Sequence, residues 1–85
     1  MAKTVIEGYL VQEKYELDGK KSKPKNLGVV FDEYEVQALI GRESEYYEEQ
    51  PFKYSRTIME NGIAYCGKNE MIMYTYEKCL VIIGD

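Results

Sequence analysis

The side chains best able to do chemistry lie in an acidic stretch between residues 32 and 49. Seven carboxylates and three tyrosines share this stretch, and Arg42 is its one cation. Glu45 lies at helical spacing from Glu48 and Glu49, so a helix would bring these carboxylates together. General acid–base catalysis needs one carboxylate to be desolvated so that its pKa rises. These three glutamates lie in a polar run with nothing to bury them, so we interpret them as a solvated face and not as a catalytic pair.

Carboxylates interleaved with tyrosines suit docking on a basic surface of another protein. Complementary charge accelerates the encounter, and tyrosine rings anchor the complex. If that surface binds nucleic acid, the carboxylates would stand where phosphates bind. Virus-encoded inhibitors of host defence share this small acidic composition, an analogy that names no family. The residues predicted to bind the partner are Glu43, Glu45, Tyr46, Tyr47, Glu48 and Glu49. An ordinary solvated helix is the alternative.

A second candidate site would bind nucleotides or single-stranded nucleic acid. Tyrosines exposed on a sheet face can stack on bases, and lysines can neutralise phosphates. The residues concerned are Lys20, Lys21, Lys23, Lys25, Tyr54, Tyr65, Tyr74 and Tyr76. Two alternatives compete with this reading: the lysines can form a solvated hairpin tip, and the tyrosines can form the core. A shift of one residue in strand register exchanges the two faces, so the sequence leaves both open.

The residues that phosphate binding, nucleophilic catalysis or zinc binding would require are missing from the sequence. Gly62–Lys68 fits the spacing of a phosphate-binding loop, but Asn69 replaces the Ser or Thr that would hold magnesium. The chain has no His, so a Ser or Cys nucleophile lacks its usual base, and the paired ligands of a zinc site are missing. We therefore predict a protein that is not an enzyme and that uses no metal or cofactor.

The location is predicted to be cytoplasmic. Met1–Thr4 starts no secretory signal, Ala2 is not the glycine that myristoylation requires, and no apolar run is long enough to span a membrane. Cys66 and Cys79 both lie in apolar runs, which favours free buried thiols over a disulfide.

Length and charge limit the remaining classes. The 85 residues are predicted to form a single domain, 1–85. The net charge is −4, and residues 31–60 alone carry −5. This balance is unfavourable for binding duplex DNA and favours a basic partner. Nine of the eleven aromatic residues are Tyr, which suits half-buried strands and protein interfaces.

In the first half of the chain, period-two alternation predicts a strand over Thr4–Leu17, with a bulge at Gly8. Asp18-Gly19 is expected to form a turn. A loop over Lys20–Asn26 and an antiparallel strand over Leu27–Phe31 should follow.

One short helix is predicted over Glu33–Ile40. Asp32 and Glu35 have the spacing of a capping box, and Gly41 is a plausible end. The helix could resume through Glu43–Glu49 with Ser44 as its cap.

In the second half, Asn61-Gly62 predicts a hairpin between Lys53–Glu60 and Ile63–Cys66. After a turn at Gly67–Glu70, we expect a last hairpin around Glu77-Lys78. It would join Met71–Tyr76 to Cys79–Ile83, with Leu80–Ile83 buried on both faces. A buried helix over Met71–Ile83 is the alternative.

The predicted fold class is α+β: an antiparallel sheet of about five strands, with the helix between the second and third strands. A small closed β-barrel is the runner-up. An exposed strand edge or tyrosine face could also make the protein a structural or assembly component that forms a homo-oligomer.

Overall fold

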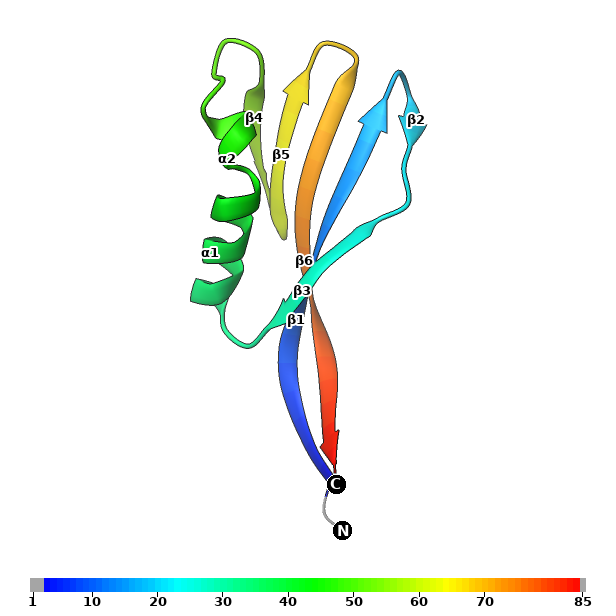
Figure 1. Ribbon diagram of the computed structural model, residues 1–85, viewed down its shortest axis with the longest axis vertical. Helices are drawn as coiled ribbons and strands as arrows, with labels where there is room; N and C mark the ends of the chain where they lie inside the picture. Colours follow the sequence, from blue (N-terminus) through cyan, green and yellow to red (C-terminus); the bar gives the residue numbers. More distant parts are fainter. Residues whose placement is uncertain (1–2, 85) are drawn as a thin grey trace.

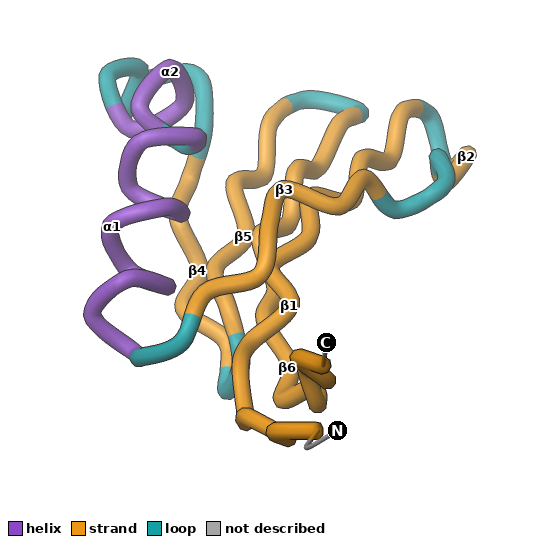
Figure 2. Tube along the Cα trace, turned by 60° about the horizontal axis from the view of Figure 1, so that its bottom comes forward, coloured by secondary structure: helices purple, strands orange, loops and turns teal. Residues whose placement is uncertain are grey.

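The computed structural model describes residues 3–84, which form one open antiparallel sheet with two short helices on one of its faces (Figures 1 and 2). In chain order the elements are β1 (Lys3–Leu17), β2 (Lys20–Lys21), β3 (Lys25–Val30), α1 (Glu33–Glu43), α2 (Glu45–Glu48), β4 (Ser55–Met59), β5 (Gly62–Gly67) and β6 (Glu70–Gly84). The predicted antiparallel sheet is confirmed as part of a small α+β or mainly β fold, but it has six strands in place of five, and two short helices between the third and fourth strands in place of one between the second and third. The closed barrel is wrong, because the order β2-β1-β6-β5-β4, with β3 also on β1, leaves β4 at an open edge. The expectations about Met1 and Ala2 lie outside the described residues.

The long first strand is confirmed. Its alternation points Val11 into the core, beneath the helix. The turn after it is also confirmed: Asp18 and Gly19 have φ values of 52° and 81°, and Leu17 pairs with Lys20. The predicted bulge is misplaced. The register shifts between Val11 and Gln12, where β3 contributes an extra residue, and not at Gly8.

The predicted lysine loop and second strand are partly corrected. Lys20–Lys21 and Lys25–Asn26 belong to strands, so only Ser22–Pro24 is irregular. The return strand β3 is antiparallel to β1, as expected.

The predicted helix is confirmed at its start and longer than expected at its end. The Asp32 carboxylate accepts a hydrogen bond from the Glu35 N–H at 2.7 Å, which satisfies a free backbone donor. Gly41 lies inside α1 and does not end it. The helix ends at Glu43, and the N–H of the following cap residue, Ser44, donates to the Ile40 carbonyl. Ser44 then precedes α2, but its side chain makes no capping hydrogen bond there.

The hairpin of β4 and β5 is confirmed, but its turn is displaced by one residue. Met59 pairs with Gly62, so Glu60 and Asn61 are the central residues, and neither has a positive φ. Gly62 serves close packing instead, because a Cβ there would clash with the carbonyl oxygen of Tyr74 in β6. The turn after Gly67 is confirmed, with Asn69 at φ 64°.

The predicted last hairpin and the alternative helix are both wrong. Residues 70–84 form the single strand β6, which pairs with β1 along its whole length. Glu77 and Lys78 lie inside this ladder, opposite Leu10 and Tyr9, and make no turn. Leu80–Ile83 is not a buried central strand, because its sole pairing partner is β1. Figure 1 shows β1 and β6 continuing as a two-stranded ribbon beyond the rest of the molecule.

The core lies between α1 and one face of the sheet, and tyrosines fill much of it. Tyr54, Tyr65 and Tyr74 are buried together with Val11, Val36, Leu39, Ile40 and Ile72. The Tyr47 ring packs edge-on against Tyr54, with 5.0 Å between the ring centroids, and lies 5.8 Å from the Tyr65 ring. Each hydroxyl of the three buried tyrosines has a hydrogen-bond acceptor, as buried polar groups require.

Two further predictions concern the cysteines and the membrane. Cys66 and Cys79 are free thiols, but both are half-buried and not fully buried as predicted. Within residues 3–84, neither helix has the length and the apolar character that crossing a bilayer requires.

Candidate protein-binding surface

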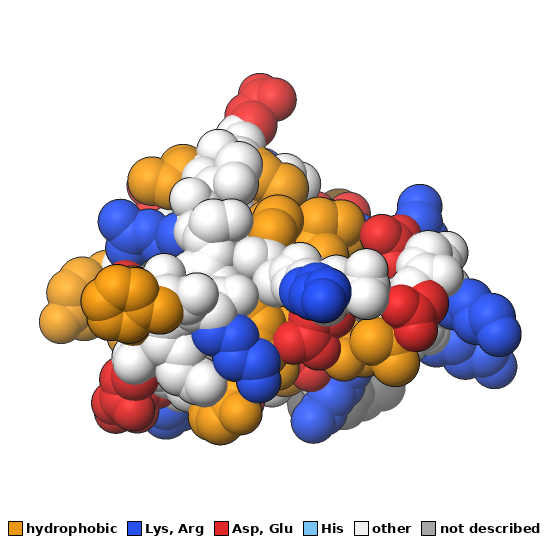
Figure 3. Space-filling model, turned by 90° about the horizontal axis from the view of Figure 1, so that it is seen from above, with side chains coloured by type: hydrophobic (Ala, Val, Ile, Leu, Met, Phe, Trp, Pro, Cys, Tyr) orange, Lys and Arg blue, Asp and Glu red, His pale blue; other side chains and the backbone are white. Residues whose placement is uncertain are grey.

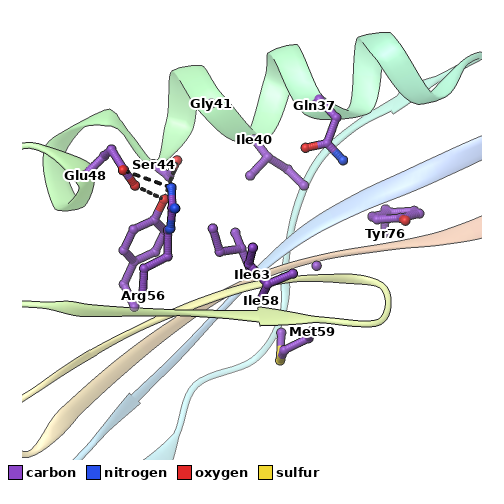
Figure 4. Close-up of a pocket in the computed structure, with 12 residues that line it drawn as sticks. Gln37, Ile40, Gly41, Ser44, Glu48, Arg56, Ile58, Met59, Ile63 and Tyr76 are labelled. Carbon is purple, nitrogen blue, oxygen red and sulfur yellow. Dashed lines mark hydrogen bonds and ion pairs between the residues drawn. The ribbon is translucent and has the colours of Figure 1, made fainter.

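A groove of about 500 Å³ runs between the helices and the β4–β5 hairpin (Figure 4). One wall is a stripe of the helical segment with Gln37, Gly41, Ser44 and Glu48. The floor is apolar and consists of Ile40, Ile58, Met59 and Ile63. This surface is called the helix–hairpin groove below.

The groove exists because α1 faces the β4–β5 hairpin without packing closely on it. Helix α1 buries Val36, Leu39 and Ile40 against the sheet, so its next stripe overhangs β4 without contacting it closely. Gly41 has no side chain to fill the gap. The space beside it is open, because a Cβ there would meet nothing within 4 Å. Ile58 on β4 consequently keeps 76% of its surface exposed.

A polar cluster closes one end of the groove. Glu48 accepts a hydrogen bond from the Tyr65 hydroxyl at 2.7 Å and pairs with Arg56 at 3.1 Å. Figure 4 shows these contacts joining α2 to the hairpin. The Tyr65 hydroxyl also lies 3.3 Å from the Ser44 Oγ. Burial, together with the hydrogen bond to Glu48, raises the pKa of Tyr65, so its hydroxyl stays protonated and donates.

The other end opens past Tyr76 into a second hollow. Tyr76 lines both spaces and packs edge-on against Tyr9, with 5.9 Å between the centroids. The second hollow is lined by Glu33, Glu60, Asn61, Glu77 and Lys78 as well as the two rings. Three carboxylates therefore oppose one ammonium group, and the rim here is acidic.

The predicted partner-binding residues separate into three groups. Glu48 lines the groove, whereas Glu45, Tyr46 and Glu49 are exposed on or beside α2. The Tyr47 ring packs into the core. Glu43 is exposed, but its carbonyl oxygen accepts a hydrogen bond from the Tyr74 hydroxyl at 3.1 Å. The acidic segment thus contributes one carboxylate, Glu48, to the groove and one tyrosine ring, Tyr47, to the core.

The residues of the predicted nucleotide site do not come together. Tyr54, Tyr65 and Tyr74 are buried beneath the helices, and Tyr76 is half-buried. Lys20, Lys21, Lys23 and Lys25 are exposed on and around β2. Figure 3 shows basic side chains gathered at that edge of the molecule, on the right. In the sheet order, β2 lies at the end opposite β4, so these lysines are remote from the helix–hairpin groove.

Sequence reasoning missed the apolar floor of the groove. Ile58 and Ile63 were assigned to strands, but the pattern does not say which face they occupy or that the helix leaves them uncovered. The one available signal was the even spacing of Phe52, Tyr54 and Ile58. Residues at even spacing share one face of a strand, and Tyr54 is in the core. That spacing places Ile58 on the helix side of the sheet.

Residues 3–84 contain no group of three Cys, Asp or Glu side chains arranged to hold a metal ion. Comparison of the chain with protein-family models, with curated proteins and with solved structures found no significant match.

Proposed function

We propose that the protein is a non-enzymatic binding protein that inhibits or modulates a partner protein by docking on its basic surface. The observation that carries this proposal is the helix–hairpin groove, whose apolar floor opens at one end toward a hollow lined by three carboxylates. Apolar anchors in a pocket supply binding energy, and the surrounding charges steer the encounter and select the partner.

The lining of the groove indicates the chemistry of the partner segment. Ile58 and Ile63 need apolar side chains to cover them, and burying a group the size of Ile58 contributes about 1.5–3 kcal/mol. Glu33, Glu60 and Glu77 at the second hollow, with Glu45 and Glu49 on the helical side, favour lysine and arginine beside those anchors. A nucleic-acid-binding surface of a host-defence protein would carry such cations, and the carboxylates would take the place of phosphates there.

A synthetic peptide of alternating leucine and lysine clusters, designed as an amphipathic helix, is a suitable probe. Isothermal titration calorimetry gives its affinity, and NMR shift mapping gives its position. We expect the largest shifts at Ile40, Ile58 and Ile63. Ile58→Asp should weaken binding roughly tenfold or more. Phe52→Asp is the matched control, because Phe52 is an exposed apolar residue that does not line the groove.

The carboxylates on the helical side of the groove have their own test. Replacing Glu45, Glu48 and Glu49 with Gln should abolish detectable binding, and Glu45→Gln/Glu49→Gln alone should weaken it by roughly tenfold at low salt. The control is Glu16→Gln/Asp18→Asn, which removes two charges away from the groove. Equal loss in both double variants would indicate a nonspecific effect of net charge and would count against the groove.

A further inference from the structure

The ribbon of β1 and β6 has the geometry of an interaction surface. Beyond the body of the sheet, Lys3–Gly8 pairs only with β6, and Glu77–Gly84 pairs only with β1. Val5, Leu80 and Ile82 lie on one face of this ribbon and keep 57%, 68% and 66% of their surfaces exposed. Two isolated strands are marginally stable in water, and an exposed apolar ribbon with free edges is a template for further pairing.

The free edge of β1 is complementary to itself. An antiparallel pairing of two copies about Val5 sets Lys3 opposite Glu7 of a second copy and Glu7 opposite Lys3 of that copy. Lys3, Val5 and Glu7 lie on the same face, because side chains alternate along a strand. Opposite charges directly across a strand pair are favourable, so this register is selected over its neighbours.

The same pairing extends the apolar surface. Val5 is the cross-strand partner of Ile82. A two-fold axis at Val5 therefore creates a row of four apolar side chains, Ile82–Val5–Val5–Ile82, across a four-stranded sheet. On the opposite face, Ile6 and Val81 pair in one copy and adjoin Thr4 and Ile83 of the other.

The free edge of β6 lacks this complementarity. Antiparallel pairing about Val81 would place Lys78 opposite Gly84, and pairing about Leu80 would place Lys78 opposite Ile82. Each arrangement leaves the charged side chain without an opposite charge. We propose that the β1 edge, residues 3–7, docks on the β1 edge of a second copy of this chain and forms a two-fold homodimer with a continuous four-stranded sheet.

Charge reversal tests the register. Sedimentation velocity over a range of concentrations should show a dimer for the unaltered chain. Lys3→Glu and Glu7→Lys should each raise the dimer dissociation constant by roughly tenfold or more, because each creates two like-charge pairs across the axis. The double variant Lys3→Glu/Glu7→Lys restores opposite charges and should restore the dimer. Within one copy these residues face Gly84 and Leu80, so the swap alters no directly opposed charge pair among residues 3–84.

Disulfide capture tests the position of the axis. With Cys66 and Cys79 replaced by Ser, Val5→Cys should form a covalent dimer under mild oxidation, since directly opposed residues lie about 4.5–5.5 Å apart. Val81→Cys is the matched control: in this dimer two copies of residue 81 are separated by three strand spacings, about 14 Å. A monomer at high concentration, no rescue by the double variant, or cross-linking through residue 81 in place of residue 5 would each overturn the proposal. Circular dichroism of each variant is the control for folding.

Discussion

The hydroxyl of Tyr65 donates to the Glu48 carboxylate across 2.7 Å, and this contact ties helix α2 to strand β5. Glu48 also pairs with Arg56 on β4, so one carboxylate joins three elements at the closed end of the helix–hairpin groove. A side chain predicted to bind a partner thus also holds part of the fold. Its replacement in a binding experiment therefore needs a separate measurement of stability.

Tyr65→Phe should lower the free energy of unfolding by about 1 kcal/mol. The substitution keeps the buried ring and removes the donor to Glu48 and Ser44. Urea unfolding followed by circular dichroism measures the change. Tyr34→Phe is the control, because Tyr34 is exposed and its hydroxyl makes no hydrogen bond within the described residues. If both variants match the unaltered protein, the Tyr65 hydroxyl does not stabilise the junction.

Glu70 predicts a pH dependence. Hydrogen bonds from the hydroxyls of Tyr54 and Tyr15 lower the pKa of the Glu70 carboxyl below its ordinary value. A carboxyl with a lower pKa in the folded state stabilises the fold above its unfolded pKa, and this contribution disappears as the pH falls through the folded pKa. The free energy of unfolding should therefore decline below about pH 4.3, and it should decline less steeply in Glu70→Gln.

Urea unfolding at a series of acidic pH values measures this difference. An NMR titration of the Glu70 side-chain carboxyl carbon gives its pKa directly. A value at or above that of an ordinary glutamate would contradict the assigned role of the two tyrosines.

Features encoded locally could be predicted from the sequence. The capping pair Asp32 and Glu35 marks the start of α1, because the cap is made within four residues. The Asp18-Gly19 turn is equally local, since it needs only two residues that tolerate a positive φ. Gly41 misled the prediction of the helix end: glycine is common after a helix, but a helix whose next turn has hydrogen-bond partners can continue through it.

Features that depend on distant pairing could not be predicted. Glu77-Lys78 resembles a turn in sequence, but β1 supplies a partner for every residue of β6. The paired residues are far apart in the sequence, so no local pattern reveals them. The same holds for the tyrosines and the groove. Tyr65 and Tyr74 are buried because the register turns them under α1, and Ile58 is exposed because α1 does not pack closely on β4.

The alternative of nucleotide or single-strand binding predicts a large thermal shift. A ligand at 100 times its dissociation constant adds about 2.7 kcal/mol, or roughly 10–20 °C for a chain of this size. Because Tyr54, Tyr65 and Tyr74 are buried, we expect no such shift with mono-, di- or cyclic nucleotides or short single strands, at low or high salt. A specific shift that disappears in Lys20→Gln/Lys21→Gln would instead place binding at β2 and count against the helix–hairpin groove.

Two glycines should respond to alanine in opposite directions. Gly62→Ala places a Cβ against the Tyr74 carbonyl oxygen, and backbone cannot yield as a flexible side chain can, so β5 and β6 must separate. We expect a loss of about 3 kcal/mol or more in the free energy of unfolding. Gly41→Ala has open space and lies inside α1, where alanine is favoured by about 0.5–1 kcal/mol, so it should stabilise the protein. Thermal and urea unfolding of the two variants measure both changes. Similar behaviour of the two would show that β5 does not approach β6 as closely as the register requires.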